Sequence, residues 1–323
     1  MKLKLSVGRV ISFQVVKARN AALPTFLFLP GVNRSLLADE AALEALSNEG
    51  FGVVTMNFST QPFSVNQLSK GALPDFRATS YTIEQLGAEV SALADVLKKK
   101  FAAKNIIPVS ISYSSAVSST LNNFPFIIDA VPMTSSAAVN PELEAYRAYL
   151  KTGEIFNPIF GPGITRSLLD QSYYKKWATQ VDSIVEQFDL NKDRRADMIE
   201  GYTVLSRATE GFVWDLKKTP SQTRRVFLFA RDDSPSLLKD QLQLFLNSLD
   251  SNSNSLAFIV NDSGHVLPVD QPVAYANILS FLASSESKSA SGIFEVQPGA
   301  KKQKNYQGAE AKKYIKAIIN SLN

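Results

Sequence analysis

Short apolar runs alternate with helical segments along most of this chain, and this alternation limits its possible folds more than any other feature does. The runs are rich in branched and aromatic residues and are bounded by turn residues, as strands buried on both faces are. They occupy residues 25–29, 52–58, 106–111, 128–133, 225–230 and 256–260. Segments with apolar residues at three-to-four spacing separate most of the runs. These segments are residues 36–48, 83–101, 236–249 and 272–283. The order predicts an α/β fold with a mostly parallel, doubly wound sheet.

One long stretch departs from the alternation. Between residues 134 and 225 the patterns are helical, for example at residues 166–177 and 180–188, and no convincing strand occurs. The sequence therefore predicts an α-helical insertion that covers the carboxyl edge of the sheet as a lid. An antiparallel hairpin at a sheet edge is expected around residues 7–16.

These patterns divide the chain into four parts. Residues 1–134 form the first part of the predicted core, residues 135–220 the lid, residues 221–284 the second part of the core, and residues 285–323 a serine-rich linker with a basic C-terminal helix.

Composition and charge narrow the range of functions. The chain has no cysteine, which excludes disulfides, a cysteine nucleophile and thiolate metal sites. The net charge of +4 belongs to the tail, because residues 301–323 hold six lysines and one acidic residue. The rest of the chain is close to neutral, which argues against nucleic acid as a partner. The first ten residues show no signal-peptide pattern, and no apolar run reaches the roughly 20 residues of a membrane helix, so we expect a cytoplasmic protein.

The C-terminal segment has an amphipathic pattern. Apolar residues fall on one helical face, namely Tyr314, Ile315, Ile318, Ile319 and Leu322. Such a helix could bind a membrane surface or a partner. We favour the other interpretation, a terminal helix docked on its own domain. The sequence does not indicate an oligomeric state.

Candidate catalytic residues follow three of the predicted strands. Ser112 lies where the run at 106–111 meets a helical segment, Asp233 follows the run at 225–230, and the only histidine, His265, follows the run at 256–260. Asp232 is the alternative to Asp233 as the acid. The chain order of serine, acid and histidine resembles that of the catalytic triad of the α/β-hydrolase superfamily, in its lid-bearing branch of esterases and peptidases.

The resemblance extends over roughly residues 10–285. Tyr81-Thr-Ile-Glu-Gln-Leu86 is similar to the start of the helix before the nucleophile strand, and Gly264-His265 with Asp270-Gln-Pro272 is similar to the closing segment of that family. The nucleophile elbow departs from the pattern. In place of Gly-x-Ser-x-Gly the chain has Ser110-Ile-Ser112-Tyr-Ser114.

The resemblance implies a role for each candidate. Ser112 would be the nucleophile and His265 the general base that takes its proton. Asp233 would orient the histidine, since the spacing from Ala230 to Asp233 matches the Gly-x-x-Asp of the family. The oxyanion hole would consist of the backbone N–H groups of Tyr113 and Val32.

The resemblance implies a serine hydrolase that cleaves a carboxylic ester or a related small-molecule acyl compound through an acyl-enzyme on Ser112. A serine nucleophile separates the chain from dehalogenase-like and epoxide-hydrolase-like relatives, which would have an aspartate there. Cleavage of amides, thioesters or carbon–carbon bonds, and acyl transfer, stay open. The altered elbow motivates an alternative, a ligand-binding receptor or pseudoenzyme with little turnover.

We expect neither a cofactor nor a metal. Residues 189–200 place acidic residues at a spacing similar to that of a calcium loop, but Arg194 occupies the position where the sharp turn needs glycine. The sequence predicts a solvated helix start capped by Asp193 instead.

Overall fold

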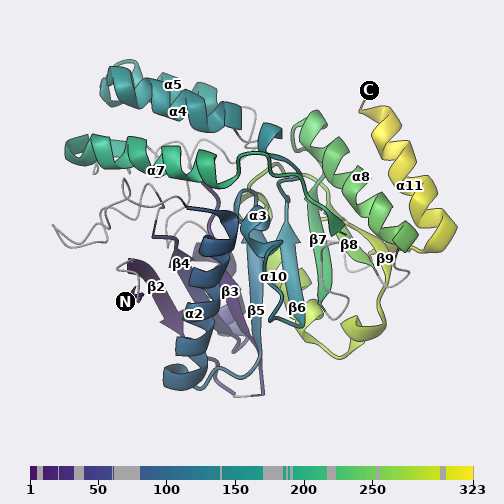
Figure 1. Ribbon diagram of the computed structural model, residues 1–323. Helices are drawn as coiled ribbons and strands as arrows, with labels where there is room; N and C mark the ends of the chain where they lie inside the picture. Colours follow the sequence, from purple (N-terminus) through teal and green to yellow (C-terminus); the bar gives the residue numbers. More distant parts are fainter. Residues whose placement is uncertain are drawn as a thin grey trace.

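A single sheet runs through the computed structural model of the chain (Figure 1). The structure describes residues 1–5, 10–20, 22–32, 40–59, 61, 81–138, 140–169, 185–186, 188–189, 192–216, 223–251, 255–298 and 303–322. Within these residues the sheet has ten strands in the order β1-β2-β4-β3-β5-β6-β7-β8-β9-β10. The strands are β1 (Lys2–Lys4), β2 (Val10–Val16), β3 (Thr25–Phe28), β4 (Gly52–Asn57), β5 (Ile106–Ile111), β6 (Phe126–Ala130), β7 (Arg224–Ala230), β8 (Leu256–Val260), β9 (Gly292–Val296) and β10 (Lys304–Tyr306).

The central strands β3 to β9 pair in parallel, while β1, β2 and β10 pair antiparallel at the two edges. Strands β3, β5 and β8 are buried at every position, which explains why the sequence shows them as continuous apolar runs. The predicted parallel sheet is confirmed. An antiparallel hairpin of β1 and β2 lies at its edge, but its first strand is Lys2–Lys4, which precedes the predicted range of residues 7–16.

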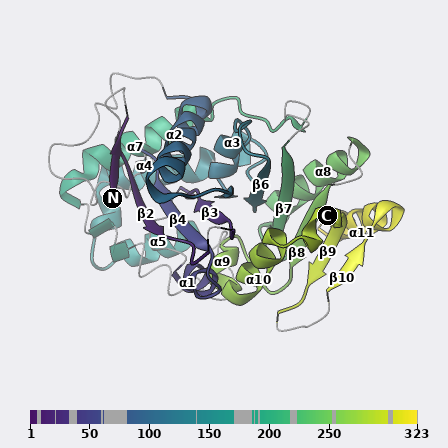
Figure 2. The same cartoon turned by 90° about the horizontal axis from the view of Figure 1, so that it is seen from below.

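Helices cover both faces of the sheet (Figure 2). On one face lie α2 (Ile83–Phe101), α3 (Ser114–Ser118) and α8 (Pro235–Ser251); on the other lie α1 (Glu40–Asn48), α9 (Leu267–Asp270) and α10 (Pro272–Ala283). Successive side chains of β7 point to opposite faces of the sheet. Phe227 and Phe229 pack with α8 on one face, whereas Val226 and Leu228 pack with α10 on the other. This is the doubly wound arrangement that the sequence predicts.

The segment between β6 and β7 carries helices α4 (Asn140–Thr152), α5 (Gly161–Leu169) and α7 (Arg195–Ala208). In the described part of this segment the only β-type pairing is an isolated bridge between Ser135 and Val213. Helices α4 and α7 pack through stacked rings of Tyr146 and Tyr202, whose centroids are 5.4 Å apart. The predicted helix at 166–177 overlaps the end of α5, and residues 170–184 lie outside the described part of the chain.

Strand β6 begins and ends earlier than the run at 128–133 predicts. The strand ends early because of a turn at Val131, which has a φ of +42° and donates its N–H to the Leu228 carbonyl at 2.7 Å. Val131 is completely buried, so its side chain continues the apolar pattern although its backbone has left the strand. Pro132 follows and has no N–H to offer to a ladder.

Two strands, β9 and β10, lie where the sequence predicts only a linker and a helix. The serine-rich segment is fixed to the core, because Arg224 donates to the carbonyls of Ser287 and Ala290 at 2.8 and 2.6 Å. Beyond β10, helix α11 (Gly308–Ser321) packs against α8 and buries Ile315 and Ile318. The terminal helix is therefore docked on its own domain, as favoured. Of the helices in the described ranges, none combines the length and apolar character needed to cross a membrane.

Candidate active site

The candidate nucleophile occupies a sharp turn between β5 and α3. Ser112 is half-buried and has a φ of +54°, a region that residues other than glycine seldom adopt. The turn is supported from both sides, since the Ser112 N–H donates to the Ala130 carbonyl at 3.0 Å and its own carbonyl accepts from the Ser115 hydroxyl at 2.6 Å. The expected strand-to-helix turn is therefore present at Ser112.

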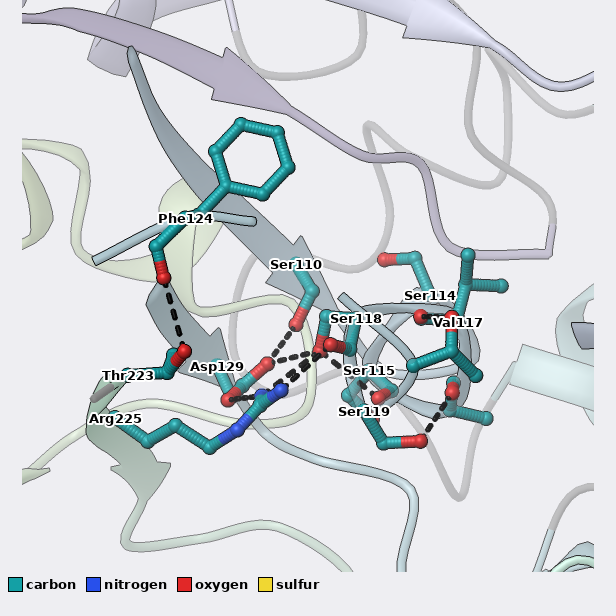
Figure 3. Close-up of polar contacts among 12 residues, drawn as sticks. Ser110, Ser114, Ser115, Val117, Ser118, Ser119, Phe124, Asp129, Thr223 and Arg225 are labelled. Carbon is teal, nitrogen blue, oxygen red and sulfur yellow. Dashed lines mark hydrogen bonds and ion pairs between the residues drawn. The ribbon is translucent and has the colours of Figure 1, made fainter. Parts of the chain in front are cut away.

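The two serines that stand in place of the family's glycines are both buried and hydrogen-bonded, and Figure 3 shows the hydrogen bond of Ser110. Ser110 donates to Asp129 Oδ1 at 2.7 Å. The Ser114 hydroxyl accepts from the Ile111 N–H at 2.8 Å and lies 3.0 Å from the Leu29 carbonyl, which joins the ends of β3 and β5. A buried hydroxyl is tolerated when it has a partner, so this elbow accommodates serine in place of glycine.

His265 reaches Ser112 from the loop after β8. Its Nε2 lies 2.8 Å from Ser112 Oγ. The loop is held by Asp270, whose Oδ2 accepts from the Gly264 N–H at 2.7 Å, and by Gln271, which donates to the Asp262 carbonyl at 2.7 Å. The geometry allows a proton to pass between the serine hydroxyl and the imidazole.

The acid beside the imidazole is Asp233 and not its neighbour Asp232. His265 Nδ1 lies 3.1 and 3.0 Å from the two carboxylate oxygens of Asp233. The Asp233 side chain is completely buried and also accepts from the Ser234 N–H at 2.8 Å and from Gln241 Nε2 at 3.3 Å. Asp232 is exposed. The structure therefore brings Ser112, His265 and Asp233 together in one hydrogen-bonded row.

The two candidate oxyanion donors lie on neighbouring segments. Val32 follows β3 and Tyr113 follows Ser112, and both residues are buried. Within the described residues, neither backbone N–H donates to a protein acceptor. Gln61 orients the loop of Val32 by donating to the carbonyls of Gly31 and Val32 at 2.6 and 2.5 Å. Gln61 is not among the residues that the sequence indicates for the site, because nothing in its local pattern marks it.

The side chain of Tyr113 connects the elbow to the helical insertion. Its hydroxyl donates to the Leu205 carbonyl in the last turn of α7 at 3.0 Å. Tyr113 is fully buried, and burial raises the pKa of its phenol far above the usual value, so the hydroxyl keeps its proton. The insertion is thereby held against the turn that carries Ser112.

No cluster of metal-binding side chains occurs in the part of the chain that the structure describes. The predicted cap at Asp193 is wrong. Asp193 lies in a short 3₁₀ turn (Lys192–Arg194), and α7 begins after Arg194, which makes no side-chain cap. Arg194 instead pairs with Asp197 in the first turn of the helix at 3.1 Å.

The sequence matches no protein-family model and no curated protein. Solved structures match nearly the whole chain. An α/β-hydrolase enzyme from a Medee basin deep-sea metagenome library has 14% identity and a TM-score of 0.63, over 88% of this chain and 98% of that one. An esterase from Exiguobacterium antarcticum has 12% identity and a TM-score of 0.63, over 88% and 99% of the two chains. The enol-lactonase from Burkholderia xenovorans has 14% identity and a TM-score of 0.58, over 88% and 100%.

Identities this low carry the fold across but not an activity. The chain has the α/β-hydrolase fold.

Proposed function

We propose that this protein is a serine hydrolase that cleaves a carboxylic ester or a related acyl compound through an acyl-enzyme on Ser112. The observation that carries the proposal is the row from Ser112 Oγ to His265 Nε2 at 2.8 Å and from His265 Nδ1 to Asp233 at 3.0 Å. A nucleophile, a base and an orienting acid within hydrogen-bond reach are what activation of a serine hydroxyl requires.

The reaction has two balanced halves. Ser112 Oγ attacks the acyl carbon while its proton passes to His265 Nε2, and the tetrahedral oxyanion accepts from the N–H groups of Tyr113 and Val32. The imidazolium then gives its proton to the leaving alcohol as the ester bond breaks. Water repeats the sequence on the acyl-enzyme, releases the acid and restores the Ser112 hydroxyl. Asp233 stays a carboxylate throughout and stabilises the imidazolium.

The position of the helical insertion is consistent with its acting as a lid over Ser112 in this reaction. It leaves the sheet at the carboxyl end of β6, beside the turn at Ser112, and Figure 1 shows α4, α5 and α7 together beyond that end of the sheet. The hydroxyl of Tyr113 joins it to the elbow. We propose that the insertion limits access of water and substrate to Ser112.

The competing function is a binding protein on the same scaffold, which the serines at positions 110 and 114 motivate. A panel of p-nitrophenyl esters with acyl chains of increasing length separates the two. The proposal predicts saturable turnover by the native chain and loss of that turnover in Ser112→Ala. A folded native chain that is stabilised against heat by an ester or acid but releases no nitrophenol would favour the binding protein.

A further inference from the structure

A buried polar cluster, shown in Figure 3, contacts the chain on both sides of the candidate nucleophile turn. It consists of Ser110 on β5, Ser118 on α3, Asp129 on β6 and Arg225 on β7. Asp129 and both serines are completely buried, and Arg225 is only 7% exposed. None of these four side chains takes part in the proton transfers proposed above.

The ion pair of Asp129 and Arg225 organises the cluster. Arg225 Nη1 lies 2.8 Å from Asp129 Oδ2, while the other carboxylate oxygen accepts from the hydroxyls of Ser110, at 2.7 Å, and of Ser118. Arg225 Nη2 donates to the Ser118 carbonyl at 2.6 Å. The guanidinium also lies 5.4 Å from the ring centre of Trp214, in the part of the insertion that follows α7. The ion pair and its contacts thus connect strands β5, β6 and β7 with helix α3 and with the segment that carries Trp214.

The elements held in this way have little rigidity of their own. Helix α3 has five residues, too few to be stable without tertiary contacts. The φ of +54° at Ser112 is strained and persists only where the surroundings impose it. Asp129 holds β5 two residues before Ser112, and Arg225 satisfies a carbonyl at the end of α3, six residues after Ser112. The turn is therefore anchored on both sides by the same pair.

Stability alone does not explain why such a pair is buried. Removing two charges from water is unfavourable, and well-packed apolar residues in their place often give an equal or higher stability. An ion pair with several directional hydrogen bonds does, however, fix relative positions that apolar packing leaves adjustable.

We propose that Asp129 and Arg225 are positioning residues that hold the Ser112 hydroxyl in line with His265. This inference rests on the proposed serine-hydrolase function for its effect on rate, but the position of Ser112 has an independent reporter. His265 is the only histidine, so its imidazole gives one set of NMR signals, and its Nε2 lies 2.8 Å from Ser112 Oγ.

The test compares two perturbed chains with a matched control. The double variant Asp129→Leu/Arg225→Met replaces the pair by apolar side chains. Arg225→Lys keeps the positive charge but loses the planar guanidinium, which donates to Asp129 and to the Ser118 carbonyl through two different nitrogens. The control is Arg224→Met, which removes the neighbouring arginine of the same strand, one that donates to two carbonyls on the opposite face of the sheet. Urea unfolding establishes that each chain is folded.

Two readouts are measured on each folded chain, the rate constant for labelling of Ser112 by a fluorophosphonate and the imidazole NMR signals of His265. We expect the labelling rate to fall about 10- to 100-fold in both perturbed chains, because a displacement near 1 Å has an effect of this size. The His265 signals should move in the same chains, and the control should match the native protein in both readouts.

Native labelling rates and native His265 signals in a folded Arg225→Lys chain would overturn the proposal, whether or not the double variant folds. A native chain that is never labelled at Ser112 would instead overturn the proposed function. In that event the His265 signals alone decide whether the pair positions the turn.

Discussion

Replacing Asp233 by asparagine should abolish most of the proposed hydrolase activity while leaving the fold intact, and the contacts of the carboxylate explain why. Both oxygens face His265 Nδ1, and they also accept from the Ser234 N–H and from Gln241 Nε2. The Ser234 donor is backbone and cannot turn, so the asparagine oxygen must face it. The asparagine NH₂ then points toward Gln241, whose amide can flip, because its Oε1 is buried without a hydrogen-bond partner among the described residues.

In that orientation the asparagine NH₂ also faces the imidazole. It donates to His265 Nδ1 and therefore favours the tautomer with the proton on Nε2. A protonated Nε2 cannot accept the proton of Ser112 Oγ, which lies 2.8 Å away. The wrong tautomer in a serine hydrolase lowers kcat on the order of 10⁴-fold. We expect a loss of about 10³- to 10⁴-fold here, or about 4 to 5.5 kcal/mol of transition-state stabilisation.

The assay is the second-order rate constant of fluorophosphonate labelling at Ser112, followed by intact mass. Asp232→Asn is the matched control, because Asp232 is the exposed neighbour on the same turn and should label at the native rate. The free energy of unfolding should change by only about 1 kcal/mol in Asp233→Asn, since the number of hydrogen bonds is nearly conserved. Labelling of folded Asp233→Asn within tenfold of the native rate would refute this reasoning about the tautomer.

Three further changes have defined outcomes. Asp270→Ala leaves the buried Gly264 N–H without its acceptor, so it should lower the free energy of unfolding in urea by about 1 to 3 kcal/mol. It should also slow ester turnover, because Asp270 holds the loop of His265. Unchanged turnover would contradict this role of Asp270. Tyr113→Phe removes only the hydroxyl bond to Leu205 and should destabilise by about 1 kcal/mol, with the labelling rate preserved because the backbone N–H is kept. Burial raises the pKa of Tyr113, so the phenol binds its proton more tightly in the folded state than in the unfolded state, and this contribution to stability is complete below about pH 10 and declines at higher pH. Above this pH the free energy of unfolding of the native chain should therefore fall more steeply than that of Tyr113→Phe. Parallel curves of unfolding free energy against pH would contradict this prediction. Ile315→Ala should cost about 2 to 5 kcal/mol by urea unfolding with native labelling, and a stability change near zero would contradict the docked terminal helix.

The parts of the fold that the sequence predicts well are those with a strong periodic signal. Strands at 106–111 and 256–260 and helices at 83–101 and 272–283 have the predicted bounds, because burial on both faces of a strand, or on one face of a helix, dictates residue type. Strand β10 could not be predicted, because it lies at the sheet edge and its three residues, Lys304 to Tyr306, form no apolar run. Two of them are exposed, and Tyr306 is half-buried. The turn at Val131 could not be predicted either, because a buried apolar residue in the sequence is equally compatible with a strand and with a turn.

The candidate site divides in the same way. Ser112, Asp233 and His265 were identifiable because each lies shortly after an apolar run, in a chain order that resembles the triad of the α/β-hydrolase superfamily, and parallel strands bring their carboxyl ends to one edge of the sheet. Gln61 was not identifiable, since its role depends on a contact with a loop about thirty residues away.

The buried ion pair did leave a signal in the sequence. Asp129 and Arg225 are charged residues within apolar runs that form strands buried on both faces. A charge in such a position is rarely tolerated unless it is paired, so two charges of opposite sign in adjacent strands indicate a buried ion pair. The register of β6 and β7 aligns Asp129 with Phe227 and Arg225 with Ile127, so the two charges meet diagonally, and only the side-chain contact in the structure identifies the pair.

The central claim, that Ser112 is an activated nucleophile, is tested most directly by intact-mass analysis after incubation with a small, uncharged fluorophosphonate. The native chain and Ser112→Ala are compared, with circular dichroism to establish that both are folded. We predict one adduct on the native chain and none on Ser112→Ala. A folded native chain without an adduct, or an equal adduct on Ser112→Ala, would contradict the claim.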